Sequence, residues 1–240
     1  MSSLSVIIPF FNESQLVVEV LNEVRLILPD AEVIAVDDGS TDDTKEKILS
    51  CRGVKVLVLN RNCGQSAAMY AGLCSAKGDF LAMMDGDGQN DPAEIPKLVA
   101  AMRTADVAFG IRKDRKDSAA RLIASKIANA IRRFALGDTA TDTGCSLKVI
   151  RREHVRFLVP FNGLHRYLPA FLQQAGLRSV EISVNHRMRK AGVSKYTING
   201  RAMRGLYDLI GVRWLIKRRI VWPNKLNLSG RLIDSSSHNL

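Results

Sequence analysis

The sequence predicts an α/β fold in which helices flank a mostly parallel sheet, and two observations predict this class. Short apolar runs alternate along the first hundred residues with segments whose apolar residues have helical spacing. Polar motifs follow directly after several of the apolar runs. Strands that alternate with helices in this way form parallel sheets covered on both faces, and ligands bind at the carboxyl ends of their strands.

The first three elements are a strand, a helix and a second strand. Residues 5–9 form a short apolar run and are predicted to be the first strand. Residues 14–28 carry apolar side chains three and four positions apart, which predicts a helix with one buried face. The next apolar run, at 31–36, predicts the second strand.

The following elements repeat this alternation. Residues 54–59 and 80–84 are apolar runs that predict two more strands. Helices are expected over 65–76, between these strands, and over 93–102, after them. A longer segment, 203–222, has the pattern of one or two amphipathic helices.

Length and composition describe one globular unit, or one domain with an appended segment. The chain has 240 residues, of which 46% are hydrophobic and 25% charged, enough to bury a sizeable core. We expect a main domain over 1–200, divided at about residue 111, then basic amphipathic helices over 201–223. Residues 224–240 lose the hydrophobic pattern and are expected to form a loose tail.

The cysteines and the N-terminus favour a cytoplasmic setting. The four cysteines include no CxxC pair and no zinc-ligand spacing, so neither a disulfide framework nor a zinc site is expected. The first predicted strand begins almost at once, which leaves no room for a signal peptide. No stretch approaches the roughly 18 consecutive apolar residues of a transmembrane helix.

Charge is divided unevenly along the chain. Residues 1–111 contain 9 Lys and Arg against 16 Asp and Glu, a net −7, whereas residues 112–240 contain 26 against 8, a net +18, which together give the total of +11. A basic half attracts phosphate groups. Nucleic acid is not the expected partner, because only 6% of residues are aromatic and no zinc-finger or RNP-like motif is present.

The motif Asp85-Gly86-Asp87-Gly88-Gln89 follows the predicted strand at 80–84 directly. Two carboxylates at a strand's end provide the hard oxygen ligands that Mg²⁺ and Mn²⁺ prefer, with substrate diphosphate oxygens completing the coordination. The alternative is a polar turn that merely ends the strand.

Two more polar motifs follow the first and second strands. Pro9, Asn12 and Glu13 belong to the first, and Asp37 and Asp38 open the second. Adjacent carboxylates at the end of a parallel strand suit hydrogen bonding to a base or a ribose. The acidic pair 42–43 is equally well explained as a helix N-cap. Neither a GxGxxG fingerprint nor a P-loop is present.

Together these motifs resemble those of inverting family 2 glycosyltransferases with a GT-A (Rossmann-like) fold. The resemblance covers roughly residues 4–215 and is strongest to the branch that contains dolichol-phosphate mannose synthases and bacterial polyprenyl-phosphate glycosyltransferases. The segments that carry it are 6–13, 37–42, 60–65, 85–92, 165–167, 186–189 and 192–196.

The resemblance implies the roles of the donor residues. Pro9, Asn12 and Glu13 would line the nucleotide pocket, and Asp37 and Asp38 would contact the base or the ribose. Asp85 and Asp87 would meet the donor diphosphate through Mg²⁺ or Mn²⁺, with Gln89 as a further ligand. A UDP-sugar is favoured as donor, and GDP-mannose stays open.

On the acceptor side, the resemblance implies a polyprenyl phosphate, such as undecaprenyl or dolichyl phosphate. This acceptor is already an anion and needs positioning more than deprotonation. Arg112 and Arg121 are the expected ligands of its phosphate, with Ser125 beside them, because guanidinium binds phosphate bidentately. Arg189 and Lys195 belong to a basic segment expected to close over the bound donor.

The segment 203–222 suits peripheral binding to the cytoplasmic face of a membrane, with Trp214 and Trp222 as interfacial anchors. For Leu206 and Ile210, packing against the sheet is as well supported. Relatives in this branch carry transmembrane helices after the catalytic domain, and no such segment is found here. Direct membrane binding, a membrane-protein partner and a homo-oligomer therefore all stay open.

Two alternatives remain. A saccharide hydroxyl as acceptor would require a carboxylate base, for which Asp138 and Asp142 are the candidates; Asp142 could instead contact the sugar or orient an arginine. A catalytically idle membrane-binding module would keep the fold without the chemistry, but the intact motif at 85–89 argues against it. His165 is expected to have at most a supporting role on the acceptor side.

Overall fold

The computed structural model describes residues 2–112, 119–188 and 198–218, with the backbone alone for 119–125, 198–204 and 206. Its centre is a seven-stranded sheet in the order β3-β2-β1-β4-β6-β5-β7. The strands are β1 (Leu4–Phe10), β2 (Glu32–Asp37), β3 (Val54–Val58), β4 (Phe80–Met83), β5 (Val107–Arg112), β6 (Lys148–Arg151) and β7 (Ser179–Val184).

The sheet is mostly parallel, as the sequence predicts. Strands β1 to β4 are parallel to one another, and β5 is parallel to β7. Only β6 runs antiparallel, between β4 and β5. The carboxyl ends of β1, β2, β3 and β4 therefore share one edge, where the polar motifs of the donor half come together.

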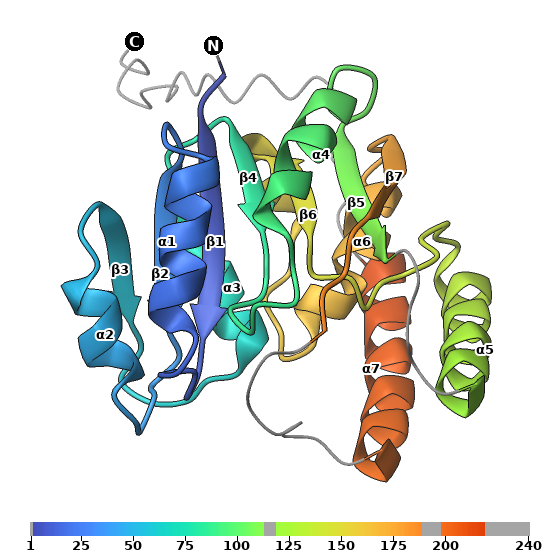
Figure 1. Cartoon of the computed structure of the whole chain (residues 1–240). Helices are drawn as coiled ribbons and strands as arrows, with labels where there is room; N and C mark the ends of the chain where they lie inside the picture. Colours follow the sequence, from blue (N-terminus) through green and yellow to red (C-terminus); the bar gives the residue numbers. More distant parts are fainter. Residues whose placement is uncertain (1, 113–118, 189–197, 219–240) are drawn as a thin grey trace, which may run out of the picture.

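Helices cover both faces of the sheet (Figure 1). One face packs against α1 (Val17–Ile27), α2 (Thr44–Ser50) and α4 (Ile95–Ala101), around a core that includes Ile8 and Leu21. The other packs against α3 (Gln65–Ser75) and α6 (Leu164–Gln174), around a core that includes Ile7 and Leu168. Side chains that alternate along β1 thus enter two separate cores.

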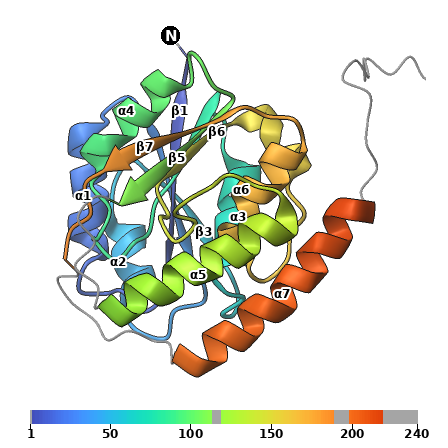
Figure 2. The same ribbon diagram turned by 90° about the vertical axis from the view of Figure 1, so that its right-hand side faces the viewer.

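Two long helices, α5 (Ala119–Leu136) and α7 (Ile198–Arg218), lie side by side outside this sandwich (Figure 2). Leu209 and Val212 of α7 are buried and belong to the same core as α6. Arg166 of α6 forms an ion pair of 3.1 Å with Asp208 of α7, and Tyr167 donates a 2.8 Å hydrogen bond to the carbonyl of Gly205. α7 is therefore held to α6 along its middle.

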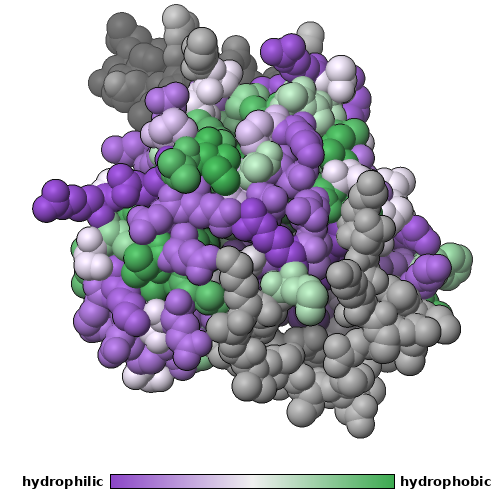
Figure 3. Space-filling model, viewed as in Figure 1, coloured by the Kyte–Doolittle hydropathy of each residue, from purple (hydrophilic) through white to green (hydrophobic). Residues whose placement is uncertain are grey.

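The α1–α2–α4 face of the molecule is mostly hydrophilic, and its apolar patches are small and separate (Figure 3). No helix in the part of the chain that the structure describes is long and apolar enough to cross a bilayer.

The predicted elements of the donor half are confirmed to within about three residues at their ends. The segment predicted as one or two amphipathic helices contains a single helix, α7, whose described part runs to Arg218. The boundary proposed at residue 200 falls inside this helix. No helices or strands were predicted between residues 103 and 202, where the structure has β5, α5, β6, α6 and β7.

Candidate active site

The loops after β1 and β2 are joined by hydrogen bonds. The Asn12 side chain accepts a 2.8 Å bond from the amide of Thr41 and donates a 3.2 Å bond to its hydroxyl. The amide of Glu13 donates to the Thr44 hydroxyl at 2.8 Å. Asn12 has a φ of 52°, a conformation that asparagine tolerates better than most residues. Asn12 and Glu13, predicted to line the nucleotide pocket, are thus fixed at the edge that the donor motifs share, and Pro9 lies in β1 just before them.

Asp38 orders the next loop along the edge. Its two carboxylate oxygens accept the amides of Cys63 and Gly64 at 2.8 and 2.9 Å. Burial raises the pKa of Asp38, although these two hydrogen bonds oppose the rise. A side chain at Gly39 would come within 2.3 Å of the Arg61 backbone, so only glycine allows this approach. The carboxylate of Asp38 is therefore engaged by backbone amides in this structure.

Neighbouring acidic residues have local partners as well. Asp37 is buried and accepts the amide of Ser40 at 3.3 Å. Asp42 accepts both the amide and the hydroxyl of Thr44, the first residue of α2, at 3.0 and 2.5 Å. Burial alone would raise the pKa of Asp42, but the hydrogen bonds from Thr44 and Ser14 outweigh it and lower the pKa. Asp43, the N-cap residue, makes no side-chain cap, so of the two candidates Asp42 caps α2.

The Asp85–Gln89 motif forms the turn after β4. Asp85 Oδ1 accepts a 2.6 Å hydrogen bond from the side chain of Gln65, at the start of α3. The backbone at Gly86 lies against the Phe10 ring, so that an added Cβ would be only 2.4 Å from Phe10 Cδ1. Burial and the neighbouring charge of Asp87 raise the pKa of Asp85 to about 6.

These residues fit a divalent cation that completes its coordination with substrate. The repulsion between Asp85 and Asp87, which contributes to the raised pKa, is the kind that a bound cation relieves. No group of three or more acidic, His or Cys side chains that could hold a metal occurs among the described residues. Two carboxylates without a full protein cage are the arrangement expected for Mg²⁺ or Mn²⁺ beside a diphosphate.

Arg187, just after β7, fastens this turn to the rest of the fold. Its guanidinium lies 2.8 Å from Glu23 of α1 and 2.9 Å from Asp91. Its amide donates to the carbonyl of Gln89 at 2.9 Å, and the Gln89 side chain lies 3.5 Å from the His186 ring. Arg187 therefore braces the turn that carries the candidate metal ligands.

On the predicted acceptor side, Arg112 at the end of β5 is paired with Asp142. Nε and one terminal nitrogen of Arg112 each donate to a different oxygen of Asp142 at 2.8 Å. The Arg112 amide donates to the same carboxylate at 3.2 Å. Three roles were considered for Asp142: a general base, a contact to the sugar, and the orientation of an arginine. Its contacts with Arg112 support the third role.

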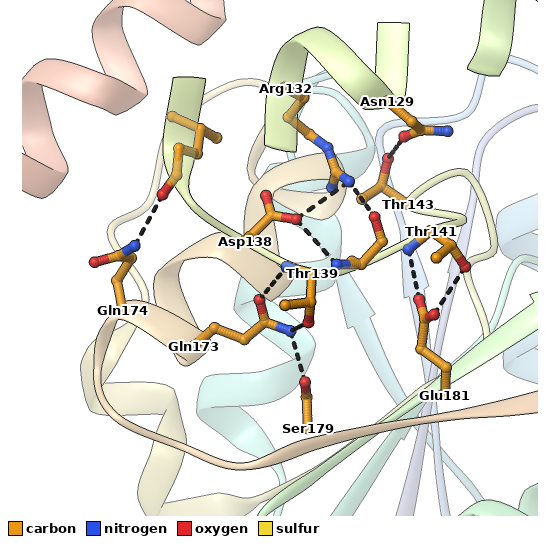
Figure 4. Close-up of polar contacts among 12 residues, drawn as sticks. Asn129, Arg132, Asp138, Thr139, Thr141, Thr143, Gln173, Gln174, Ser179 and Glu181 are labelled. Carbon is orange, nitrogen blue, oxygen red and sulfur yellow. Dashed lines mark hydrogen bonds and ion pairs between the residues drawn. The ribbon is translucent and has the colours of Figure 1, made fainter. Parts of the chain in front are cut away.

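A polar network joins the loop that carries Asp142 to α5 (Figure 4). Arg132 of α5 forms an ion pair of 3.2 Å with Asp138, whose side chain is 0% exposed, and donates to the carbonyl of Ala140. Burial raises the pKa of Asp138, and the charge of Arg132 opposes the rise. Thr141 donates to Glu181 of β7 through both its amide and its hydroxyl, at 2.6 and 2.8 Å. The helix with Arg121 and Ser125 is thus tied to the loop that carries Asp142, the residue that orients Arg112.

Some predicted site residues are only partly placed. Arg121 and Ser125 belong to α5, but their side chains lie outside the described part of the structure. Arg189 and Lys195 lie outside the described residues altogether, as does Trp222.

Sequence reasoning missed Lys148, a buried lysine in β6. Its ammonium group donates to the carbonyl of Cys145, close to the charges of Asp85 and Asp142. Burial lowers the pKa of Lys148, and these two carboxylates oppose the fall. The lysine thus sits between the candidate metal site and the Arg112–Asp142 pair. The only signal in the sequence is a lysine within an apolar stretch.

A mostly parallel α/β sheet with two carboxylates after β4 and an arginine–aspartate pair at the end of β5 suits an enzyme that handles nucleotide diphosphate sugars. Residues 5–158 match the family described as glycosyl transferase family 2. The chain belongs to this family.

Two similar proteins within this family are named as polyprenyl-phosphate sugar transferases. The chain is 38% identical over 230 residues to the dodecaprenyl-phosphate galacturonate synthase of Rhizobium johnstonii, covering 89% of this chain and 67% of that protein. It is 36% identical over 216 residues to the undecaprenyl-phosphate 4-deoxy-4-formamido-L-arabinose transferase of Aeromonas hydrophila, covering 86% and 66%. The chain thus spans about two thirds of the length of these relatives.

Solved structures confirm the predicted GT-A fold. Glucosyl-3-phosphoglycerate synthase from Mycobacterium tuberculosis in complex with UDP superimposes with a TM-score of 0.69 at 20% identity, covering 89% of this chain and 80% of that one. The same enzyme with Mn²⁺ and UDP-glucose gives a TM-score of 0.68 at 19% identity, covering 88% and 79%.

Proposed function

We propose that this glycosyltransferase moves a sugar from a nucleotide diphosphate donor to a polyprenyl phosphate, with inversion at the sugar carbon. Both similar proteins named above transfer a sugar to a polyprenyl phosphate according to their names. A UDP-sugar is the favoured donor, since the structurally similar synthase was crystallised with UDP-glucose.

The observation that favours a phosphate acceptor over a saccharide hydroxyl is that Asp138 and Asp142 are both paired with arginines. A saccharide hydroxyl would need one of them as a general base. Asp138 is fully enclosed and paired with Arg132, while Asp142 is held at both oxygens by Arg112. Both oxygens of Asp142 are occupied by the Arg112 guanidinium, so neither is available to take a proton from a hydroxyl. A phosphate acceptor requires neither residue as a base.

At the donor end, Asp85, Asp87 and Gln89 would hold Mg²⁺ or Mn²⁺. The cation supplies Lewis-acid stabilisation of the departing nucleoside diphosphate. The chain's own part is to fix the two carboxylates, through Gln65 at Asp85 and through the brace of Arg187 behind the turn. At the acceptor end, Arg112 in the orientation set by Asp142, together with Arg121 and Ser125 of α5, would receive the lipid phosphate.

The lipid substrate requires the protein to contact a membrane surface. α5 and α7 carry exposed apolar side chains that suit such a contact. We call the exposed side chains Ile127, Ile131 and Phe134 of α5 with Tyr207, Ile210 and Trp214 of α7 the α5–α7 face. Residues 127, 131 and 134 form one stripe along α5. Exposed cationic side chains, including Arg213 and Lys217, lie on the same helices and suit anionic head groups. These side chains support the proposal that the protein binds peripherally on the cytoplasmic side, either directly or through a membrane-protein partner or a second copy.

A transfer assay tests this proposal. Purified protein is incubated with Mg²⁺ or Mn²⁺, short-chain polyprenyl phosphate and a panel of radiolabelled UDP- and GDP-sugars, among them UDP-galacturonate. Metal-dependent label in the organic phase is the expected result. Label transferred to an added saccharide instead would favour the hydroxyl acceptor, and absence of transfer from every donor would favour the idle module.

Asp87→Ala supplies the internal control for metal dependence. It should lose transfer by at least about 100-fold while the thermal midpoint changes little, since Asp87 lies in a surface turn. Asp30→Ala is the matched control, because this exposed aspartate precedes β2 at the opposite edge of the sheet. Near-normal turnover of Asp87→Ala would contradict the metal assignment.

A further inference from the structure

Ser66 and His165 form a hydrogen-bonded pair next to the candidate metal site. The Ser66 hydroxyl lies 2.7 Å from Nδ1 of His165. The same hydroxyl accepts the backbone amides of Gly163 at 3.0 Å and of His165 at 3.5 Å. Ser66 is in the first turn of α3 and His165 in the first turn of α6, so the pair joins the ends of two helices.

The hydrogen bonds fix the position of the imidazole proton. A serine hydroxyl has two acceptor lone pairs and one proton. Both lone pairs of Ser66 are used by backbone amides, so its proton is left to donate to Nδ1 of His165. If Nδ1 carried a proton, the serine would have to accept three hydrogen bonds. The neutral ring therefore carries its proton on Nε2.

The ring is also held neutral. Burial, and then the charges of Arg166 and Lys148, lower the pKa of His165 to about 3. At physiological pH the residue is a fixed donor at Nε2, not an acid or base that changes state. No hydrogen-bond partner of Nε2 is found among the described residues.

The position of the pair relates this unused donor to the reacting groups. Ser66 directly follows Gln65, whose side chain donates to Asp85 at 2.6 Å. Lys148, whose charge acts on the His165 ring, also acts on Asp85. His165 therefore lies at the same edge of the sheet as the carboxylates proposed to bind the cation and the donor diphosphate.

We propose that the Nε2–H of His165 donates a hydrogen bond to a phosphate oxygen of bound substrate, and that Ser66 is the positioning residue that sets this tautomer. The inference rests on the proposed function and adds a substrate-binding residue to it. The phosphate belongs either to the nucleoside diphosphate or to the polyprenyl phosphate, and both present the same anionic oxygen to a neutral donor.

The test compares His165→Gln with His165→Phe. A glutamine side chain places an amide N–H near the position of Nε2, whereas phenylalanine keeps the ring shape without a donor. Binding of UDP and of GDP in the presence of Mn²⁺ is measured by calorimetry, and kcat and KM are measured with farnesyl phosphate as acceptor. We expect His165→Phe to weaken binding of the phosphate-bearing ligand by about 10-fold. In His165→Gln, this affinity should lie within about 3-fold of the wild-type value.

The arms of the experiment distinguish the source of the phosphate. Weaker nucleotide binding assigns the contact to the donor, and a raised KM for farnesyl phosphate with unchanged nucleotide binding assigns it to the acceptor. ¹⁵N NMR of the imidazole should show a protonated Nε2 in wild type and a shift of the proton toward Nδ1 in Ser66→Ala, which a purely structural role would not produce.

Contrary outcomes separate the two proposals. Unchanged binding and KM in a folded His165→Phe variant, with wild type fully active, would overturn this inference alone. If His165→Phe does not fold, a proton found on Nδ1 of the wild-type ring would overturn it equally. Failure of wild type to bind any nucleoside diphosphate or to transfer sugar would overturn the proposed function and this inference with it.

Discussion

Asp142 receives Arg112 through two parallel hydrogen bonds of 2.8 Å, so the carboxylate fixes the plane and direction of a guanidinium at the end of β5. The pair is largely enclosed, since the side chains are 17% and 7% exposed. Bidentate pairs of this kind supply geometric precision as well as energy. In this enzyme the pair prepares one of the arginines expected to receive the acceptor phosphate.

Replacing Asp142 with asparagine should therefore impair use of the acceptor. Asparagine offers one oxygen and one amide group, so it loses one of the two bonds and faces the guanidinium with another donor. We expect kcat/KM for polyprenyl phosphate to fall about 10- to 100-fold, with little change in nucleotide binding. Steady-state kinetics with each substrate varied in turn provide the measurement.

Asp106→Asn is the matched control for this experiment. Asp106 precedes β5 at its other end and accepts the side chain of Arg178 at 3.3 Å. The control breaks an arginine–aspartate contact just before the start of the same strand, at the end opposite Arg112, and should leave kcat/KM unchanged. A donor-affinity defect in Asp142→Asn without an acceptor defect would refute the assignment.

Arg187→Met tests the brace behind the metal-binding turn. The substitution leaves Glu23 and Asp91 without the guanidinium that bridges them. We expect the free energy of unfolding to fall by about 1 kcal/mol, a shift of about 2–4 °C in the thermal midpoint for a chain of this size, together with a raised KM for the donor.

Arg178→Met serves as its control, since the Arg178 side chain is 74% exposed in its pair with Asp106. An exposed pair contributes little, so the shift in the midpoint should be clearly smaller. Equal effects of the two substitutions on both stability and donor KM would show that Arg187 is an ordinary surface residue.

The sequence predicted the donor half of the molecule well because its signals are local. Apolar runs followed directly by polar motifs located β1 to β4 and the Asp85–Asp87 turn without any knowledge of packing. The roles of Asp38 and Arg187 could not be obtained in this way. Their partners, Gly64 and Glu23, are distant in sequence, and only the folded chain brings the groups together.

Burial was the second property that the sequence did not determine. No signal in the sequence shows that Lys148 is buried, yet β6 is an interior strand between β4 and β5, and the ammonium group of this lysine is buried. Conversely, Ile131 and Phe134 have the helical spacing of core residues, although they face outward on α5. Periodicity identifies an apolar stripe but does not say what covers it.

Acid should destabilise the protein through His165. The unfolded chain binds a proton near the ordinary histidine pKa of 6.5, whereas the folded chain does so only near 3. Between these values the unfolded state holds more protons, so stability falls as the pH falls through this window. Urea unfolding of wild type and His165→Gln at pH 7 and pH 5 measures the effect.

The variant removes the titrating group, so its stability should decline less over this range. Between pH 7 and pH 5, we expect wild type to lose roughly 2 kcal/mol more of its free energy of unfolding than His165→Gln, because the pKa of His165 is depressed in the folded state. His238→Gln is a control that removes a different histidine, distant in sequence from residue 165. Identical pH dependence of wild type and His165→Gln would show that the ring is not held neutral by the fold.

The α5–α7 face should determine membrane binding without contributing to folding. Phe134 is 91% exposed, so Phe134→Ser removes apolar surface that is already in water and should change the free energy of unfolding little. If the face enters the membrane interface, the same change should reduce partition onto vesicles of phosphatidylglycerol and phosphatidylcholine by about 10-fold. Co-sedimentation over a range of lipid concentrations measures the partition.

Leu26→Ser is the matched control, because Leu26 is 82% exposed on α1, on the other side of the sheet. It removes a comparable exposed side chain and should leave vesicle binding unchanged. Because the polyprenyl phosphate is embedded in the membrane, Phe134→Ser should also slow transfer to a vesicle-borne acceptor while sparing transfer to a water-soluble short-chain one. Equal partition of both variants would instead mean that another surface, or a separate membrane protein, brings the enzyme to its lipid substrate.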